Sequence, residues 1–251
     1  MVFFVFLIGL ILGSFYLVIA TRLPKGEDVL TSRSRCDTCK KELKWYNLIP
    51  LFSYAIQRGK CSYCHAPISS LHFLCELVTG ICFALCYWFF GFSYIFFVGI
   101  IVISLTIIIY ISDFKYMIIL DSPLVVGSIL IFLLKGIYYG WGEAFYSLLC
   151  GISLFVIMLL VQNLGKIIFK KDALGGGDIK LSFVMGLVLN LQLGLVSLVL
   201  STFLALPYSV ASLYLVKKDE VAYGPFLAGA MLIVFFTMDK WQILFNFLLG
   251  I

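Results

Sequence analysis

Two aspartates, Asp113 and Asp178, stand in otherwise apolar sequence, each at the end of an apolar segment long enough to form a helix. Acidic side chains are costly within a bilayer and usually mark function there. Two carboxyl groups on one side of a bilayer can share a proton, so that one acts as a base toward water and the other as an acid toward a leaving amine. The pattern therefore permits aspartic-protease chemistry, which requires neither a metal nor a covalent nucleophile.

Four cysteines have the spacing of a metal site. Cys36 and Cys39 form one CxxC pair and Cys61 and Cys64 form another, both within a sizeable polar stretch at residues 21–72. Two such pairs can bring four thiolates to one tetrahedral Zn²⁺, and a loop this small needs a crosslink of that kind to fold. We predict a structural zinc site, with the neighbouring His65 as a surface residue. No chemistry is assigned to the cysteines inside apolar segments, which are Cys75, Cys82, Cys86 and Cys150.

The composition identifies the elements that must position these groups. Of the 251 residues, 63% are hydrophobic and 12% are charged, far from the balance of a soluble domain. A helix needs about 20 apolar residues to cross a bilayer core. We predict an all-α polytopic membrane protein with about eight transmembrane helices and a small cytoplasmic zinc-binding loop domain between the first two. The predicted spans are 2–20, 73–90, 95–111, 123–139, 144–169, 179–189, 193–216 and 225–236, and the tail 241–251 either extends the last span or lies at the interface.

The basic residues predict the orientation in the membrane. With the N-terminus outside, the loops 21–72, 112–122, 170–178 and 217–224 are cytoplasmic, and all 18 Lys and Arg except Lys135 and Lys240 lie on that side. The first span has no basic residues before it, so we expect it to remain as an anchor rather than to be removed as a signal peptide. The net charge of +5 then reflects topology and contact with membrane lipids, and it predicts no nucleic-acid partner.

Several short motifs occur in a defined order along nearly the whole chain. They are Gly13-Ser14-Phe15, Arg22-Leu23-Pro24, Ser34-Arg35-Cys36, Trp45-Tyr46-Asn47 with Ile49-Pro50, Gly59, Pro67-Ile68-Ser69, Glu76, the GGGDIK run at 175–180 and Tyr223-Gly224-Pro225-Phe226. By these motifs the chain resembles the type IV prepilin peptidases.

The resemblance implies a membrane aspartic endopeptidase that removes the leader peptide from type IV prepilins and pilin-like proteins at the cytoplasmic face of the cell membrane. It also implies N-methylation of the new N-terminal residue with S-adenosylmethionine. Asp113 and Asp178 are then the catalytic acids, and precursors of pilus, secretion or competence systems are the partners. The supporting residues that it implies are Asp121, Gly175, Gly177 and Lys180.

A methyl-donor site cannot be derived from the residues, because the sequence has no GxGxxG run in a βαβ pattern. The candidates are the residues at family motif positions near the inner face, Gly13, Ser14, Arg22 and Glu76, together with Pro24. The alternatives are helix packing for Gly13 and Ser14, a topological charge for Arg22 and a buried polar partner for Glu76.

One position departs from the family pattern. The family has a Pro-Asp pair seven and eight residues after its first aspartate, where this chain has Leu120 and Asp121. Pro123 can supply the break two residues later. We expect residues 1–20 to form the first transmembrane helix, 21–72 a zinc-ribbon-like loop domain that belongs to the methyltransferase part, and 73–251 a seven-helix peptidase domain.

Two other functions are compatible with the same residues. One is a peptidase without methyl transfer. The other is a proton-coupled membrane transporter in which Asp113 and Asp178 serve a proton pathway, although such proteins often carry internal repeats and acids near the midplane.

Overall fold

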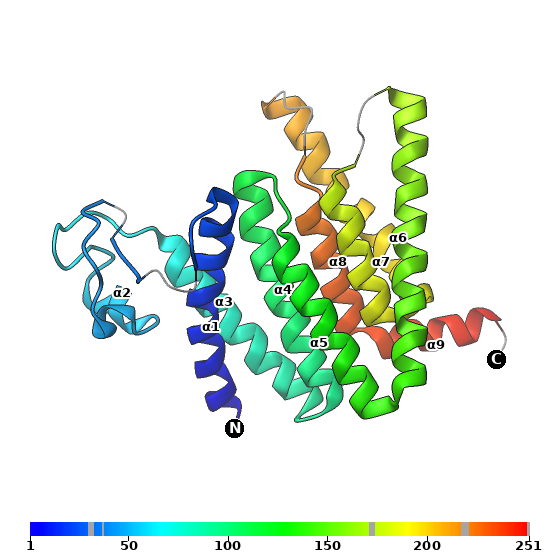
Figure 1. Cartoon of the computed structure of the whole chain (residues 1–251), viewed down its shortest axis with the longest axis horizontal. Helices are drawn as coiled ribbons and strands as arrows, with labels where there is room; N and C mark the ends of the chain where they lie inside the picture. The colour runs from blue at the N-terminus through cyan, green and yellow to red at the C-terminus, as the bar shows by residue number, and fades with distance from the viewer. Residues whose placement is uncertain (30–32, 37, 171–173, 217–220, 250–251) are drawn as a thin grey trace. The chain divides into compact units, whose positions relative to one another are not determined.

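The computed structural model spans the whole chain and describes residues 1–29, 33–36, 38–170, 174–216 and 221–249 (Figure 1). Within these ranges the regular elements are helices, and pairing between extended segments is limited to two isolated bridges, Arg35 with Glu42 and Lys60 with Pro67. The predicted all-α class is therefore confirmed.

The helices follow one another with short connections, apart from the loop between the first two long helices. Their bounds are α1 Val2–Arg22, η1 Leu23–Lys25, η2 Trp45–Leu48, α2 Phe52–Ile56, α3 Ser70–Phe90, α4 Tyr94–Tyr116, α5 Asp121–Tyr139, α6 Trp141–Phe169, α7 Gly176–Ala211, η3 Ser212–Val216, α8 Gly224–Phe236 and α9 Met238–Leu249.

Among the described residues, six helices are long and apolar enough to cross a membrane, so the chain is a multi-pass membrane protein. They are Val2–Lys25, Ser70–Phe90, Tyr94–Tyr116, Asp121–Tyr139, Trp141–Ile168 and Gly176–Tyr214. The first five match the first five predicted spans. The predicted spans 179–189 and 193–216 both fall in α7, and the predicted span 225–236 is α8, which is apolar but shorter than the six. Most of the tail 241–251 forms part of α9, and its last two residues lie outside the described ones.

The helix α7 is interrupted at Asn190, whose φ of 66° and ψ of −179° are not helical. Asparagine tolerates positive φ better than most residues. Its side chain also begins the second half of α7, because Asn190 Oδ1 accepts a hydrogen bond from the backbone N–H of Leu193 at 3.2 Å, which is the contact of a helix N-cap.

The two halves of α7 run in opposite directions. Gly177, near its start, packs against Ile119, which also contacts Gly224, the residue whose N–H donates to Asp113. Tyr208, near its end, packs against Phe114 with ring centroids 6.0 Å apart. A straight helix would separate positions 177 and 208 by about 45 Å. The chain therefore folds back at Asn190, and the two separately predicted spans are two separate helical segments.

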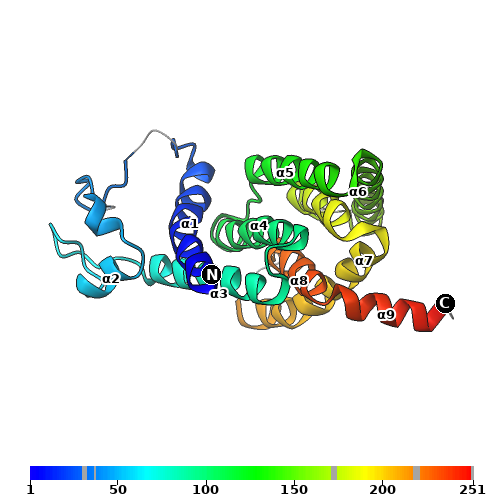
Figure 2. The ribbon, with the colours of Figure 1, turned by 90° about the horizontal axis from the view of Figure 1, so that it is seen from below.

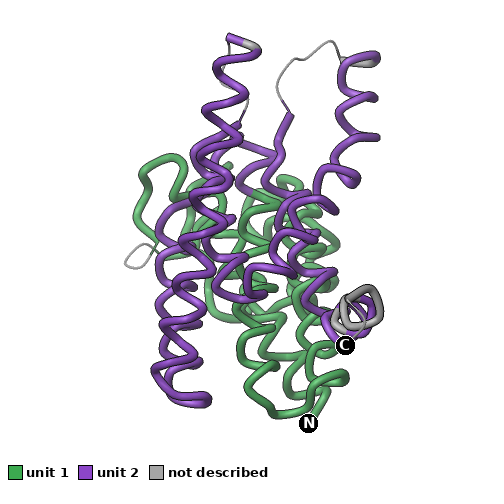
Figure 3. The backbone as a smooth tube through the Cα atoms, turned by 90° about the vertical axis from the view of Figure 1, so that its right-hand side faces the viewer, with its two compact units in different colours: residues 1–111 green, residues 112–251 purple. Residues whose placement is uncertain are grey.

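The chain divides into two compact units, residues 1–111 and 112–251, and the division falls within α4 (Figure 3). In the first unit, α1 packs on α3 through small residues. A Cβ atom at Gly9 would lie 2.8 Å from the Cα of Gly80, and one at Gly13 would lie 2.7 Å from the Oγ1 of Thr79. Such close backbone approach is typical of helix pairs in membranes.

In the second unit, α7 is the central helix and packs against α5, α6 and α8 (Figure 2). It approaches the backbone of α6 closely at Gly186, where a Cβ atom would lie 2.5 Å from the carbonyl oxygen of Cys150 and 2.7 Å from the Cα of Gly151. Because these neighbours are backbone atoms, they cannot move away without moving α6.

We expect Gly186→Val to force α6 and α7 apart and to lower the free energy of unfolding by about 1–3 kcal/mol, the usual range for overpacking. The measurement is the thermal unfolding midpoint in detergent. Gly142→Val is the control, because a Cβ atom at Gly142 meets nothing within 4 Å. Equal unfolding midpoints for the two variants would show that α6 and α7 are not closely packed at Gly186.

Candidate active site and candidate metal site

Asp113 lies in the last turns of α4, and its side chain is buried. The helix ends shortly after it, where Met117 adopts a φ of 55°. The hydrogen bond that holds the carboxyl group comes from another helix: the backbone N–H of Gly224 donates to Asp113 Oδ2 at 3.1 Å. This donor is at the start of α8, where N–H groups have no partner within the helix.

Gly224 is the residue of this site whose role the sequence did not predict. A Cβ atom there would lie 2.8 Å from Asp113 Oδ2 and 2.7 Å from the Cδ1 of Ile119, so glycine allows the N–H to approach the carboxyl group. The next residue, Pro225, has no N–H to offer. The motif around Gly224 can be found in the sequence, but the sequence does not show that Gly224 lies next to Asp113 in space.

Asp178 occupies the first turn of α7 and is also buried. The backbone N–H of Gly175 donates to Asp178 Oδ2 at 3.2 Å, and the N–H of Asp178 donates to the carbonyl oxygen of Gly175 at 3.2 Å. The acid thus caps its own helix, where the helix dipole favours negative charge. Its other oxygen, Oδ1, is buried and has no hydrogen-bond partner among the described residues.

The structure thus brings the two predicted acids together from α4 and α7. Each uses its Oδ2 atom to accept a backbone N–H from a helix start. Ile119 fills the space beside them: Cβ atoms at Gly177 and Gly224 would lie 2.6 and 2.7 Å from its side chain. Gly177 is therefore needed for close packing against an apolar wall of the site.

Asp121 and Lys180, which were predicted to support the acids, pair with each other. Lys180 Nζ lies 2.7 Å from both carboxylate oxygens of Asp121. The two side chains are 61% and 51% exposed, so water screens most of this attraction. Asp121 begins α5, and Pro123 lies in the first turn of that helix, where its missing N–H is not needed.

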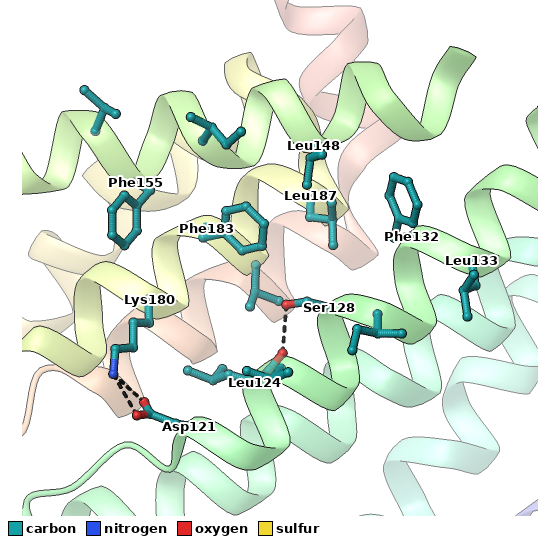
Figure 4. Close-up of a pocket in the computed structure, with 15 residues that line it drawn as sticks. Asp121, Leu124, Ser128, Phe132, Leu133, Leu148, Phe155, Lys180, Phe183 and Leu187 are labelled. Atoms are coloured by element: carbon teal, nitrogen blue, oxygen red, sulfur yellow. Dashed lines mark hydrogen bonds and ion pairs between the residues drawn. The ribbon is translucent and has the colours of Figure 1, made fainter. Parts of the chain in front are cut away.

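The ion pair lies at the edge of a cavity of about 900 Å³ between α5, α6 and α7 (Figure 4). The other lining residues are almost all apolar: Leu124, Val125, Ser128, Ile129, Phe132, Leu133, Leu148, Ile152, Phe155, Val156, Phe183, Val184 and Leu187. On α7, Lys180 and Leu187 lie about 200° and 180° around the helix from Asp178. The cavity is therefore on the opposite face of α7 from the acid.

The four predicted metal ligands are brought together in the loop. The Sγ atoms of Cys36, Cys39, Cys61 and Cys64 all lie within 4.8 Å of one another, and those of Cys36 and Cys64 are 3.9 Å apart. Four Zn–S bonds of about 2.3 Å in a tetrahedron place the sulfurs about 3.8 Å apart. The cluster can therefore hold a metal ion of the size of Zn²⁺.

The two CxxC segments repeat one backbone pattern. Lys40 and His65, each four residues after the first cysteine of its segment, have φ angles of 58° and 56°, and each donates its N–H to that cysteine's carbonyl oxygen. His65 is exposed at this turn and is not one of the four clustered ligands.

Two of the predicted methyl-donor residues already have partners within the first unit. Gly13 packs against Thr79 and accepts a hydrogen bond from the thiol of Cys75 at 3.2 Å. Glu76 is buried, and its Oε2 accepts the backbone N–H of Leu51 at 2.9 Å. Ser14 and Arg22 are half-buried on α1. The contact of these four residues with a methyl donor stays a prediction.

Two family models match the chain. A family model described as "Bacterial Peptidase A24 N-terminal domain" matches residues 7–90, and one described as "Type IV leader peptidase family" matches residues 100–210, which contain both acids. No solved structure matches the chain.

Curated relatives that carry the name prepilin leader peptidase/N-methyltransferase match over most of the chain, and three of them serve as examples. The protein of Bacillus subtilis is 31% identical over 94% of both chains. That of Myxococcus xanthus is 33% identical over 74% of this chain and 56% of its own length, and that of Vibrio cholerae is 28% identical over 92% and 95%. The resemblance based on motifs is thereby confirmed, and the chain belongs to the type IV leader peptidase family.

Proposed function

We propose that the protein is a membrane aspartic endopeptidase that removes the leader peptide from type IV prepilins and pilin-like precursors, with Asp113 and Asp178 as its catalytic residues. The observation that supports this most strongly is that two buried carboxyl groups, 65 positions apart in the sequence, lie on either side of Ile119 at the end of α4 and the start of α7. The names of the relatives support the substrate class.

The proposed chemistry needs one proton shared by the two acids. Two neighbouring carboxyl groups carry one negative charge more readily than two. The ionised group takes a proton from a water molecule that attacks the scissile carbonyl carbon, and the protonated group donates to the leaving amine. Asp178 Oδ1 suits a role in this exchange, because it is buried and has no protein partner among the described residues.

The backbone donors orient the acids without neutralising them. The N–H groups of Gly175 and Gly224 each occupy one oxygen of a carboxyl group. This leaves the second oxygen of each acid for water and substrate. Orientation of reacting groups in this way accounts for much of enzymatic rate enhancement.

The site suits a substrate with a polar leader and an apolar helix. Both acids lie at the ends of membrane-spanning helices, so a precursor held in the bilayer by its apolar helix would present the adjoining polar segment there. We assign this end of the protein to the cytoplasmic side, because the positive-inside rule places the loops 112–122 and 170–178 there.

We further propose that the protein methylates the new N-terminal amine, as the names of the relatives indicate. When bound, S-adenosylmethionine would supply an electrophilic methyl group. Gly13, Ser14, Arg22 and Glu76 remain the candidates for contact with the donor, although Gly13 O and Glu76 Oε2 already have partners in the first unit. We assign residues 21–72 to the loop domain and 73–251 to the peptidase domain, and one Zn²⁺ to the four cysteines of the loop. Neither the relatives nor the site geometry favours the transporter alternative.

Asp113→Asn and Asp178→Asn should each lower the rate of leader removal by at least about 10²-fold, the scale of lost acid–base catalysis. Cleavage of a synthetic prepilin by the purified protein in detergent measures it. Asp239→Asn, at an exposed position in α9, is the control and should cleave normally. If either catalytic variant retains the parent rate, the proposed mechanism is wrong.

Gly224→Ala should displace the carboxyl group of Asp113, because the added methyl group would lie 2.8 Å from its Oδ2 atom. A misplacement of a reacting group by about 1 Å can reduce turnover by about 10²-fold. Gly176→Ala is a matched control two residues from Asp178, since a Cβ atom there meets nothing within 4 Å. Equal cleavage rates for the two alanine variants would show that Gly224 does not position the acid.

Cys36→Ser and Cys61→Ser should abolish zinc retention, because three thiolates and a hydroxyl group bind Zn²⁺ far more weakly than four thiolates. Metal analysis of the purified protein should find one zinc per chain in the parent and in the control Cys82→Ser, whose thiol lies within α3. A metal-free parent protein with a folded loop would overturn the zinc assignment.

A further inference from the structure

The loop between α1 and α3 carries an apolar surface that the active site and the metal site do not explain. Six large apolar side chains between positions 45 and 56 are exposed, and we call them the docking surface: Trp45, Tyr46, Leu48, Ile49, Phe52 and Ile56. Trp45, Phe52 and Ile56 are 77%, 64% and 80% exposed. Phe52 and Ile56 are four residues apart and lie on one face of α2. A concentration of exposed apolar side chains in one short segment marks an interaction site.

We propose that the docking surface inserts into the headgroup region of the membrane and holds the cysteine-containing loop on a layer of anionic phospholipid. The proposal concerns the first unit alone and does not depend on the peptidase or methyl-transfer activity.

Two contacts hold the docking surface at the start of a membrane span. The backbone N–H of Leu51 donates to Glu76 Oε2 at 2.9 Å, and the ring of Tyr54 packs on that of Phe73 with centroids 5.4 Å apart. Glu76 and Phe73 both lie in the first two turns of α3. Figures 1 and 2 accordingly show α2 beside the start of α3.

The first two turns of α3 also carry exposed apolar side chains. Leu71 and Leu74 are 43% and 57% exposed, and α3 is long and apolar enough to span a membrane. Lipid must therefore reach these turns. A segment fixed to them by Leu51 and Tyr54 lies near the level at which the bilayer begins.

The docking surface is held together by its own polar contacts. Gln57 Nε2 and Ser62 Oγ both donate to Asn47 Oδ1, at 3.0 and 3.2 Å. Asn47 belongs to η2 and Gln57 follows α2 directly, so the Gln57–Asn47 hydrogen bond joins the two short helices. This contact keeps the apolar side chains of the two short helices in one region of the loop.

The residue types favour an anionic lipid surface over an apolar protein partner. Tryptophan and tyrosine prefer the bilayer interface, where an apolar ring meets water and headgroups. Basic side chains flank the apolar ones, and they attract lipid phosphates electrostatically. These flanking residues are Lys40, Lys41, Lys44, Arg58 and Lys60.

The test uses the full chain in nanodiscs of phosphatidylethanolamine and phosphatidylglycerol. The difference in tryptophan fluorescence between the parent protein and Trp45→Phe gives the signal of Trp45 alone. We expect this signal to be quenched severalfold more by a lipid with a shallow spin label than by acrylamide in the water. Replacing phosphatidylglycerol with phosphatidylcholine should weaken the lipid quenching, because the basic residues then lose their partners.

A pair of double variants tests the surface itself. Phe52→Gln with Ile56→Gln should shift the quenching of Trp45 from lipid to acrylamide, whereas Phe52→Leu with Ile56→Leu should leave it unchanged. Zinc content reports whether the loop remains folded. If the glutamine variant loses zinc, the quenching of the parent protein still decides the question.

Two results would overturn the proposal. One is a Trp45 that acrylamide quenches and the lipid label does not. The other is a water-exposed Trp45 that becomes protected only when a synthetic pilin-precursor peptide is added, which would assign the docking surface to substrate instead of lipid.

Discussion

A buried carboxyl group needs hydrogen-bond donors, and in the second unit two such groups, those of Asp113 and Asp178, each receive one from the backbone at the start of a helix. The N–H groups at a helix start have no partners within their own helix, so they are available to an acid nearby. Gly175 supplies one to Asp178 within the same helix turn, and Gly224 supplies one to Asp113 from α8. The end of α4 and the starts of α7 and α8 must therefore converge at one place.

This convergence determines the course of the chain. Because α7 folds back at Asn190, its end returns to the level of its start, and α8 can begin beside Asp113. Ile119 then fits between the starts of α7 and α8 only because positions 177 and 224 are glycines. The same geometry turns Lys180 toward Asp121 and the apolar cavity, on the face of α7 away from the acids.

The loop of the first unit is organised on a different principle. Its two CxxC segments form the same short hydrogen-bonded turn. Each turn places two cysteine side chains side by side, and the four sulfur atoms lie within 4.8 Å of one another. Contacts that place the loop on α3 include the hydrogen bond to the buried acid Glu76 and the ring contact of Tyr54 with Phe73. Glu76 thus serves to join the loop to a transmembrane helix, which agrees with the buried polar partner considered from the sequence.

The sequence by itself determined the helical membrane class, the set of four cysteines and the identity of the two acids. Length and apolar character of a segment, the CxxC spacing and short motifs are local properties, and one chain displays them directly. Only the tertiary structure decided that Gly224 holds Asp113, that Lys180 pairs with Asp121 and that the segments on either side of Asn190 run antiparallel. These features depend on contacts between residues far apart in the chain. They arise from how the helices pack, and no local pattern of residues specifies that packing.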